Sequence, residues 1–178
     1  METNFTFKTA ALMTLLSAPF IVSGCGGGGG GSSGTGTMSL AVTDAPVDGA
    51  TKVVVEFTGV EVKSTSGGRL NFDFPAPRQI DLLALNGGGS EILLDQVTLP
   101  AGNYNFLRLK VNAQNDGVND SFIELDDGSV HELTIPTADT RGLQIGNHFT
   151  IAAGGESDFT VDFDLRKSVT NPPGQNGD

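Results

Sequence analysis

Residues 53–63 read VVVEFTGVEVK, and this stretch decides the fold class. Its apolar side chains recur at positions 53, 55 and 57, which is the two-residue period of a half-buried β-strand. The pattern resumes at Val60 and Val62, one residue out of phase. Because Thr58-Gly59 lies at this slip, we expect a β-bulge that returns the apolar side chains to the inward face.

The same period extends outward from this stretch towards both ends of the chain. Apolar and polar residues alternate before it at positions 38–43 and after it at positions 69–74, where Pro75 and Pro77 are expected to end the strand. Near the carboxyl end, residues 159–166 place four large apolar side chains on one face and polar ones on the other. The apolar set is Phe159, Val161, Phe163 and Leu165, and the polar set is Thr160, Asp162, Asp164 and Arg166.

Turn residues separate the remaining strands. Pro100-Ala101-Gly102 divides residues 91–99 from 103–111, Asp127-Gly128 predicts a hairpin, and Gly154-Gly155 divides 148–153 from 159–165. Residues 80–85 suit a strand end that runs into one short helical turn, and no long stretch carries a helical period. The prediction is an all-β fold, an antiparallel β-sandwich of seven to nine strands with one short helical turn.

An apolar run, TAALMTLLSAPFIV, occupies residues 9–22. It follows Lys8, contains no charge and ends at small residues, which is the shape of a secretory signal. A membrane-spanning helix needs about 20 apolar residues, and this run is shorter.

The segment Val22-Ser23-Gly24-Cys25 resembles the lipobox of bacterial lipoproteins. The resemblance implies cleavage between Gly24 and Cys25 and fatty acyl chains such as palmitate on Cys25, two or more of which anchor a protein stably. Gly26 follows the cysteine where an inner-membrane protein tends to carry Asp, so the resemblance points to the outer membrane or cell surface. The alternative is an ordinary secretory signal in which Cys25 has no role.

These patterns divide the chain into four parts. Residues 1–24 are the expected lipoprotein signal peptide, residues 25–37 the lipidated cysteine and a Gly-rich tether, residues 38–170 the β-sandwich, and residues 171–178 a disordered tail. A tether of this composition has a root-mean-square span of about 20 Å, which holds a folded body clear of lipid headgroups.

Several motifs of the sandwich carry a family resemblance. They are Thr43-Asp44-Ala45-Pro46, Ile80-Asp81-Leu82-Leu83, Leu99-Pro100-Ala101-Gly102-Asn103-Tyr104 and Asp162-Phe163-Asp164-Leu165-Arg166-Lys167-Ser168. Over most of residues 38–169 they resemble the bacterial domain of unknown function 4382 family, which implies an exported protein or lipoprotein with an immunoglobulin-like or prealbumin-like sandwich. The third motif also looks like carboxypeptidase-regulatory-like domains. Neither resemblance implies an established activity.

Composition excludes several functional classes. The formal net charge of -11 argues against nucleic acid as a partner, and the single Cys excludes an internal disulfide. The absence of Trp and the single Tyr disfavour sugar binding by stacking. Neither G-x-S-x-G nor H-E-x-x-H is present, so we expect no enzyme, with a metal-dependent hydrolase as a distant alternative.

Two sets of residues are candidate metal ligands. If the last two strands form a hairpin with Ile151 opposite Phe159, then His148 lies opposite Asp162, with Asp164 two residues along, and the three side chains offer a divalent-metal site. The alternative is a solvated polar face.

The second set is Asn115, Asp116 and Asp120, whose oxygens suit calcium. Their spacing does not match a known calcium loop, and ordinary turn chemistry explains them equally. Asp44 and Asp81 are interpreted as caps or turn hydrogen-bonders.

The functional expectation is a non-enzymatic, lipid-anchored cell-envelope protein that presents its sandwich as a binding or scaffolding module. Its edge strands are the expected contact surface for a protein partner. No cofactor is expected. The alternative is a calcium- or glycan-binding surface module.

Overall fold

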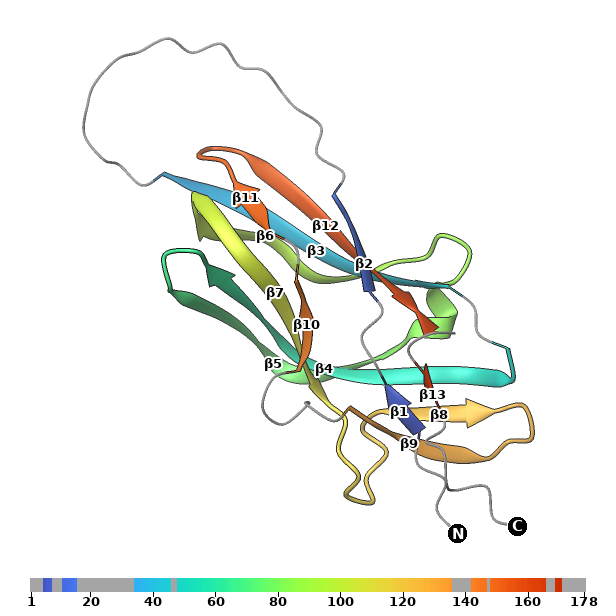
Figure 1. Ribbon diagram of the computed structural model, residues 1–178. Helices are drawn as coiled ribbons and strands as arrows, with labels where there is room; N and C mark the ends of the chain where they lie inside the picture. The colour runs from blue at the N-terminus through green and yellow to red at the C-terminus, as the bar shows by residue number, and fades with distance from the viewer. Residues whose placement is uncertain are drawn as a thin grey trace, which may run out of the picture.

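The computed structural model describes residues 5–7, 11–15, 34–45, 48–135, 142–146, 148–165 and 169–170. In this part of the chain strands dominate, and they form two packed sheets of four and nine strands (Figure 1). The all-β prediction is confirmed. The strands exceed the expected seven to nine because short segments such as β1 (Phe5–Phe7), β10 (Leu143–Ile145) and β13 (Val169–Thr170) also pair.

The four-stranded sheet has the order β2-β12-β3-β6. Its strands are β2 (Ala11–Leu15), β12 (Glu156–Asp164), β3 (Thr35–Ala45) and β6 (Glu91–Pro100). All neighbours are antiparallel except β3 and β12, which run parallel with Leu40 beside Phe159 and Val42 beside Val161. The first and last long strands of the family-like region therefore lie side by side at the centre of this sheet.

The nine-stranded sheet is built around β4 (Ala50–Ser64), the strand that contains the opening motif. On one side β4 pairs along most of its length with β5 (Arg69–Asp81). On the other side it pairs first with β8 (Phe122–Leu125) and then with β7 (Gly102–Asn112). Beyond these lie β9 (Val130–Thr134) next to β8, and β10 and β11 (Phe149–Ile151) next to β7.

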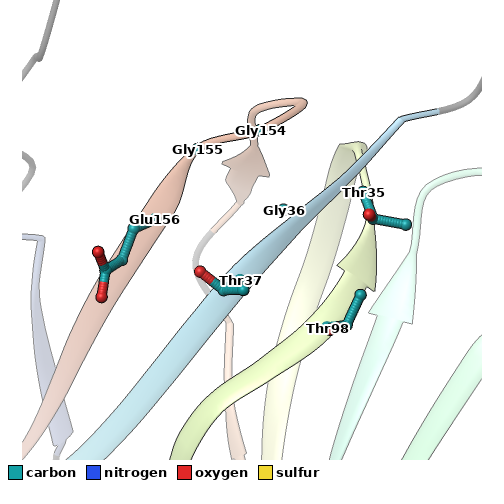
Figure 2. Close-up of a pocket in the computed structure, with 7 residues that line it drawn as sticks. All are labelled: Thr35, Gly36, Thr37, Thr98, Gly154, Gly155 and Glu156. Atoms are coloured by element: carbon teal, nitrogen blue, oxygen red, sulfur yellow. The ribbon is translucent and has the colours of Figure 1, made fainter.

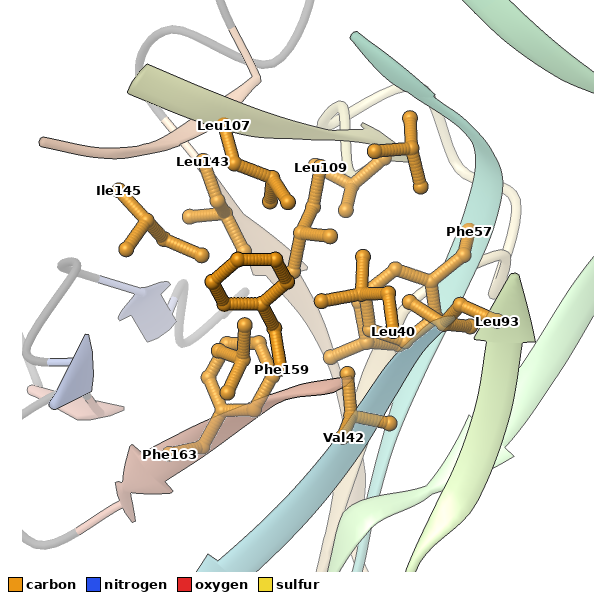
Figure 3. Close-up of a cluster of buried hydrophobic side chains, with 14 of the residues drawn as sticks. Leu40, Val42, Phe57, Leu93, Leu107, Leu109, Leu143, Ile145, Phe159 and Phe163 are labelled. Atoms are coloured by element: carbon orange, nitrogen blue, oxygen red, sulfur yellow. The ribbon is translucent and has the colours of Figure 1, made fainter. Parts of the chain in front are cut away.

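The two sheets enclose one hydrophobic core (Figure 3). Leu40, Phe57 and Phe163 are fully buried within it, and the Phe57 and Phe163 rings from opposite sheets lie 6.4 Å apart. A second aromatic group joins Phe149 to Tyr104 at 5.1 Å and to Phe159 at 5.0 Å. The apolar face predicted for residues 159–165 is therefore the face that packs inward.

The predicted β-bulge is confirmed. The register of β4 shifts between Phe57 and Gly59 against both β5 and β7. A Cβ atom at Gly59 would lie 2.7 Å from the backbone oxygen of Phe72, which is closer than any side chain tolerates. Glycine therefore allows the neighbouring strand to approach where the phase of the pattern changes.

One strand boundary was predicted wrongly. Pro75 and Pro77 do not end a strand, because β5 continues to Asp81. The register runs from Asp73, opposite Gly59, to Arg78, opposite Phe57, so residues 74–77 bow away from β4. Because β4 is its only partner among the described strands, β5 is an edge strand and tolerates residues that lack an N–H donor.

Two chain reversals are corners between the sheets. Pro100-Ala101-Gly102 carries the chain from β6 in one sheet to β7 in the other, and Gly154-Gly155 carries it from β11 to β12. The hairpin predicted for the last two strands is therefore wrong, since β11 pairs with β7 and β12 with β3 and β2. Tyr104 braces the first corner by donating a hydrogen bond of 2.7 Å to the Pro100 carbonyl oxygen.

Two local predictions are confirmed. Residues Leu82–Leu85 form the expected helical turn, η1, and the Asp81 carboxylate caps it by accepting from the Leu83 N–H at 3.2 Å. The hairpin of β8 and β9 turns at Asp127-Gly128, where Gly128 has a positive φ of 82°.

Candidate functional site

The start of β3 borders a small open pocket at the end of the sandwich that carries the two corners (Figure 2). The pocket has a volume of about 250 Å³, at the lower limit for a small-molecule site. The Thr37 N–H donates to the Gly155 oxygen at 2.9 Å, and the Gly154 N–H donates to the Thr35 oxygen at 2.8 Å. Its lining is Thr35, Gly36, Thr37, Thr98, Gly154, Gly155 and Glu156.

Glycine is required at this pocket because two backbones meet there. A Cβ atom on Gly36 would lie 2.4 Å from the Ala152 oxygen, so β3 passes the second corner only without a side chain. The one charged group in the lining, Glu156, accepts a hydrogen bond from Gln96 at 3.0 Å. The pocket therefore offers threonine hydroxyl groups and a single carboxylate.

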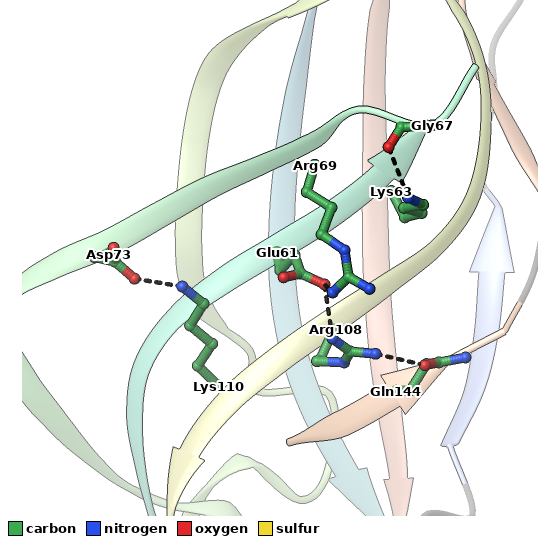
Figure 4. A network of polar contacts seen from close by, with 8 residues as sticks. All are labelled: Glu61, Lys63, Gly67, Arg69, Asp73, Arg108, Lys110 and Gln144. Carbon is green, nitrogen blue, oxygen red and sulfur yellow. Dashed lines mark hydrogen bonds and ion pairs between the residues drawn. The ribbon is translucent and has the colours of Figure 1, made fainter. Parts of the chain in front are cut away.

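The outer face of the nine-stranded sheet holds a polar network centred on Glu61 (Figure 4). Oxygen Oε1 of Glu61 accepts from Arg108 at 2.7 Å and from Arg69 at 2.9 Å. Arg108 also donates to Gln144 at 2.7 Å and lies 4.8 Å from the centre of the Phe106 ring. The two guanidinium groups neutralise a carboxylate whose residue is only 7% exposed.

A second ion pair on this face spans the bulge. Lys110 and Asp73 are both register partners of Gly59, and their charged atoms meet at 2.6 Å across the position that has no side chain. On the other side of Glu61, Lys63 donates to the Gly67 carbonyl oxygen at 2.7 Å (Figure 4). Each of the four cations described on this face already binds an acceptor within the protein. The network therefore stabilises the sheet and is not a site for an external anion.

Four titratable groups outside this network have shifted pKa values among the described residues. The hydrogen bond from Lys52, at 2.8 Å, lowers the pKa of Glu124 and raises that of Lys52. Hydrogen bonds from the hydroxyl and N–H of Ser129 lower the pKa of Asp127, and burial raises the pKa of Tyr104. None of these groups lines the pocket.

The structure does not bring the first predicted metal set together in the expected way. His148 is exposed and precedes β11, while Asp162 lies between Thr43 of β3 and Leu12 of β2. The predicted pairing of His148 with Asp162 is wrong, because strand parity specified the face of each strand but not its neighbour. In the described part of the chain no three His, Cys, Asp or Glu side chains gather as metal ligands do.

The second predicted set lies in the connection between β7 and β8. Asp116 accepts from the Val118 N–H at 3.1 Å, and Asp120 accepts from the Asn112 side chain at 2.7 Å. Asn115 is exposed. Asp116 thus has the turn-forming role that the sequence offered as the alternative, whereas Asp120 joins the connection to the end of β7.

The predicted lipidation residue, Cys25, lies outside the described residues, as do most of the expected tether and the expected tail at 171–178. Strand β3 begins at Thr35, within the range assigned to the tether. Strands β1 and β2 lie in the range assigned to the signal peptide, and β2 pairs with β12 over Phe159–Phe163.

Sequence reasoning missed the Glu61 network and the β2–β12 pairing. The alternation around Val60 and Val62 places Glu61 on the outer face, which is a usable signal for a polar side chain there. Its cation partners come from β5 and β7, and no local pattern identifies them.

Among the described residues no helix is long and apolar enough to cross a bilayer. No curated protein and no solved structure matches the chain. A family model described as Domain of unknown function (DUF4382) matches residues 35–178, which begin at the first residue of β3. The match covers most of the chain and all of the four-stranded sheet except β2. The chain therefore belongs to the DUF4382 family.

Proposed function

We propose that this protein is a lipid-anchored component of the cell envelope, at the outer membrane or cell surface, and that its sandwich is a non-enzymatic binding or scaffolding module. One observation carries the proposal. The only cysteine of the chain directly follows an apolar run and a lipobox-like segment, and it lies ten residues before the first strand of the DUF4382 domain.

The position of that first strand orients the body relative to the anchor. Thr35 pairs with Pro100, so the tether reaches the sandwich at the end that carries the two corners and the small pocket. The connections before β6 and between β7 and β8 lie at the opposite end of the strands (Figure 1). A glycine tether attached there leaves that opposite end of the strands farthest from the point of attachment.

A binding role is favoured over catalysis by what the described surface offers. The charged groups of the outer face are paired within the sheet, and the pocket contains one carboxylate beside threonine hydroxyls. Neither arrangement supplies a nucleophile with an adjacent base. A rigid sandwich with available strand edges is suited to protein partners.

The anchor is tested by Cys25→Ser in cells that process lipoproteins. The variant is expected to move from the membrane fraction to the soluble exported fraction, because the acceptor of the acyl chains is gone. A matched control, Cys25→Ser combined with Ser32→Cys, keeps one cysteine but places it away from the lipobox and is expected to remain soluble. Unchanged partitioning of the single variant would contradict the proposal.

A further inference from the structure

Strand β12 lies between β3 and β2, and β2 comes from the range assigned to the signal peptide. The strands β12 and β2 pair in the register Phe159 with Leu15, Val161 with Met13 and Phe163 with Ala11. If the signal peptide is cleaved before Cys25, as the proposed function requires, β2 is absent from the mature protein. β3 is then the one strand that pairs with β12 among the described residues, and the side of β12 that faced β2 at Phe159 and Val161 becomes a sheet edge.

The two edges of this sheet differ in how they are protected. At β6 the pairing with β3 is interrupted by register shifts, and Arg78 of β5 donates to the Ile92 carbonyl oxygen and pairs with Glu91. β12 has neither device: its pairing with β3 is regular from Glu156 to Asp164, and its sequence contains no Pro, Gly or Lys. A regular edge of this kind readily accepts another strand.

The inner face of β12 determines which side chains an added strand must present to the core. Phe159, Val161 and Phe163 are at most 2% exposed while β2 is in place. Residues directly opposite on paired strands share a face, so the incoming strand must present apolar side chains at alternate positions to the core.

The outer face of β12 determines which charge an added strand should carry on its outward side chains. The residues of β12 that alternate with the core residues are Glu156, Asp158, Thr160, Asp162 and Asp164. Glu156 accepts a hydrogen bond from Gln96, and the four strands of this sheet contain no Lys, Arg or His that could face Asp158 or Asp162. Opposite charges on facing strands stabilise pairing, and like charges oppose it.

We propose that the β12 edge of the mature protein is a strand-addition site for a partner segment in which apolar residues alternate with Lys or Arg. The inference rests on the proposed function, because it requires removal of β2. A second copy of the chain fits less well, since pairing of β12 with β12 brings two acidic rows onto one sheet face. Backbone hydrogen bonds supply the affinity and the basic residues supply the selectivity.

The test uses the full chain expressed with its leader, extracted from the membrane fraction, with its amino terminus determined by mass spectrometry. Fluorescent peptides based on residues 10–17 are titrated by anisotropy. One carries Leu12→Lys and Thr14→Lys, which lie opposite Asp162 and Thr160, and a second carries Glu at both positions. A third is the lysine peptide with methylated backbone nitrogens at positions 13 and 14, which keeps both lysines and removes one ladder donor whichever N–H faces β12.

The lysine peptide is expected to bind at least about tenfold more tightly than the glutamate peptide, and the N-methylated lysine peptide is expected to lose binding. Asp162→Asn in the protein should reduce the preference for lysine to about threefold or less. The matched control, Asp116→Asn, removes one negative charge from a distant connection and should leave the preference unchanged.

Each other outcome overturns the inference in a distinguishable way. A protein that begins at Cys25 but binds no peptide, or binds the lysine and glutamate peptides equally, contradicts strand addition and leaves the proposed anchor intact. A protein that still begins at Met1 contradicts the proposed function and with it the inference. If the mature protein is a dimer and the unsubstituted peptide of residues 10–17 dissociates it, the edge binds a second copy of the chain.

Discussion

Glu61 and Arg108 face each other on β4 and β7, with Oε1 of Glu61 2.7 Å from Nη1 of Arg108 and both side chains about nine-tenths buried. A carboxylate with so little solvent exposure is stable in the folded protein only while its cationic partners remain bound to it. The pair lies two residues from the bulge that realigns β4, so it stabilises the pairing of the central strands after the register changes.

Removal of the Glu61 carboxylate is expected to destabilise the protein strongly. Glu61→Ala leaves the buried Arg108 guanidinium without a carboxylate partner and with Gln144 as its remaining side-chain acceptor, and the free energy of unfolding should fall by about 2–4 kcal/mol. Asp73→Ala is the control, because it also removes an ion pair from the same face but at a carboxylate that is 70% exposed, and it should cost less than about 1 kcal/mol. Chemical denaturation monitored by circular dichroism measures both, and equal losses would contradict the proposed role of burial.

The first corner between the sheets depends on the phenol group of Tyr104. Tyr104→Phe keeps the ring and its stack with Phe149 but leaves the Pro100 oxygen without its donor, so stability should fall by about 1–2 kcal/mol. Thr65→Val removes an exposed hydrogen bond to Asn103 and serves as the control, with a loss below about 0.5 kcal/mol expected. Urea denaturation of the two variants compares them; a larger loss for Thr65→Val would be inconsistent with a brace at Tyr104.

The bulge requires a residue without a side chain. Gly59→Ala places a methyl group 2.7 Å from the Phe72 oxygen and forces β5 to move, so a loss of about 1–3 kcal/mol is expected. Gly68→Ala has open space around the added atom and should change stability by less than about 0.5 kcal/mol. Thermal unfolding compares the variants, and a tolerated alanine at position 59 would show that the bulge is not determined by steric contact.

The Lys52–Glu124 pair predicts a defined pH window. The pKa of Glu124 is lowered below its ordinary value of 4.5, so its contribution to stability is present above that value and is lost as the pH falls through the folded pKa. The pKa of Lys52 is raised above 10.5, so its contribution is present below that value and is lost as the pH rises through the folded pKa. The difference in unfolding free energy between the parent protein and Lys52→Met should therefore be largest between about pH 5 and 10.

That difference should vanish well below the folded pKa of Glu124, since the protonated carboxyl no longer attracts the lysine. Urea titrations at a series of pH values measure it. Asp127, whose pKa is also lowered, is present in both proteins and cancels from the comparison. A difference that persists unchanged at low pH would show that the lysine acts through packing and not through its charge.

Much of the local structure was accessible from sequence patterns. Alternation identified the inward faces of β3, β4 and β12, and the phase slip identified the bulge at Gly59, because both depend on neighbours along one strand. The Asp81 cap and the Asp127-Gly128 turn were also predictable, since each is made within a few residues.

The partners of each strand were not accessible in this way. Gly154-Gly155 fits a hairpin and a corner equally well, and the choice between them depends on whether β7 or β12 lies next to β11. This is why the predicted pairing of His148 with Asp162 failed although both strands were identified correctly.

Pattern along the chain was therefore sufficient for the all-β class, the faces of the strands and the turn chemistry, since side-chain alternation and backbone conformation are properties of short segments. Sheet order, the parallel pairing of β3 with β12 and the meeting of Arg69 and Arg108 at Glu61 were decided by tertiary packing. The reason is physical: alternation specifies which side chains enter the core, whereas the strand that lies alongside is selected by contacts between residues far apart in the chain.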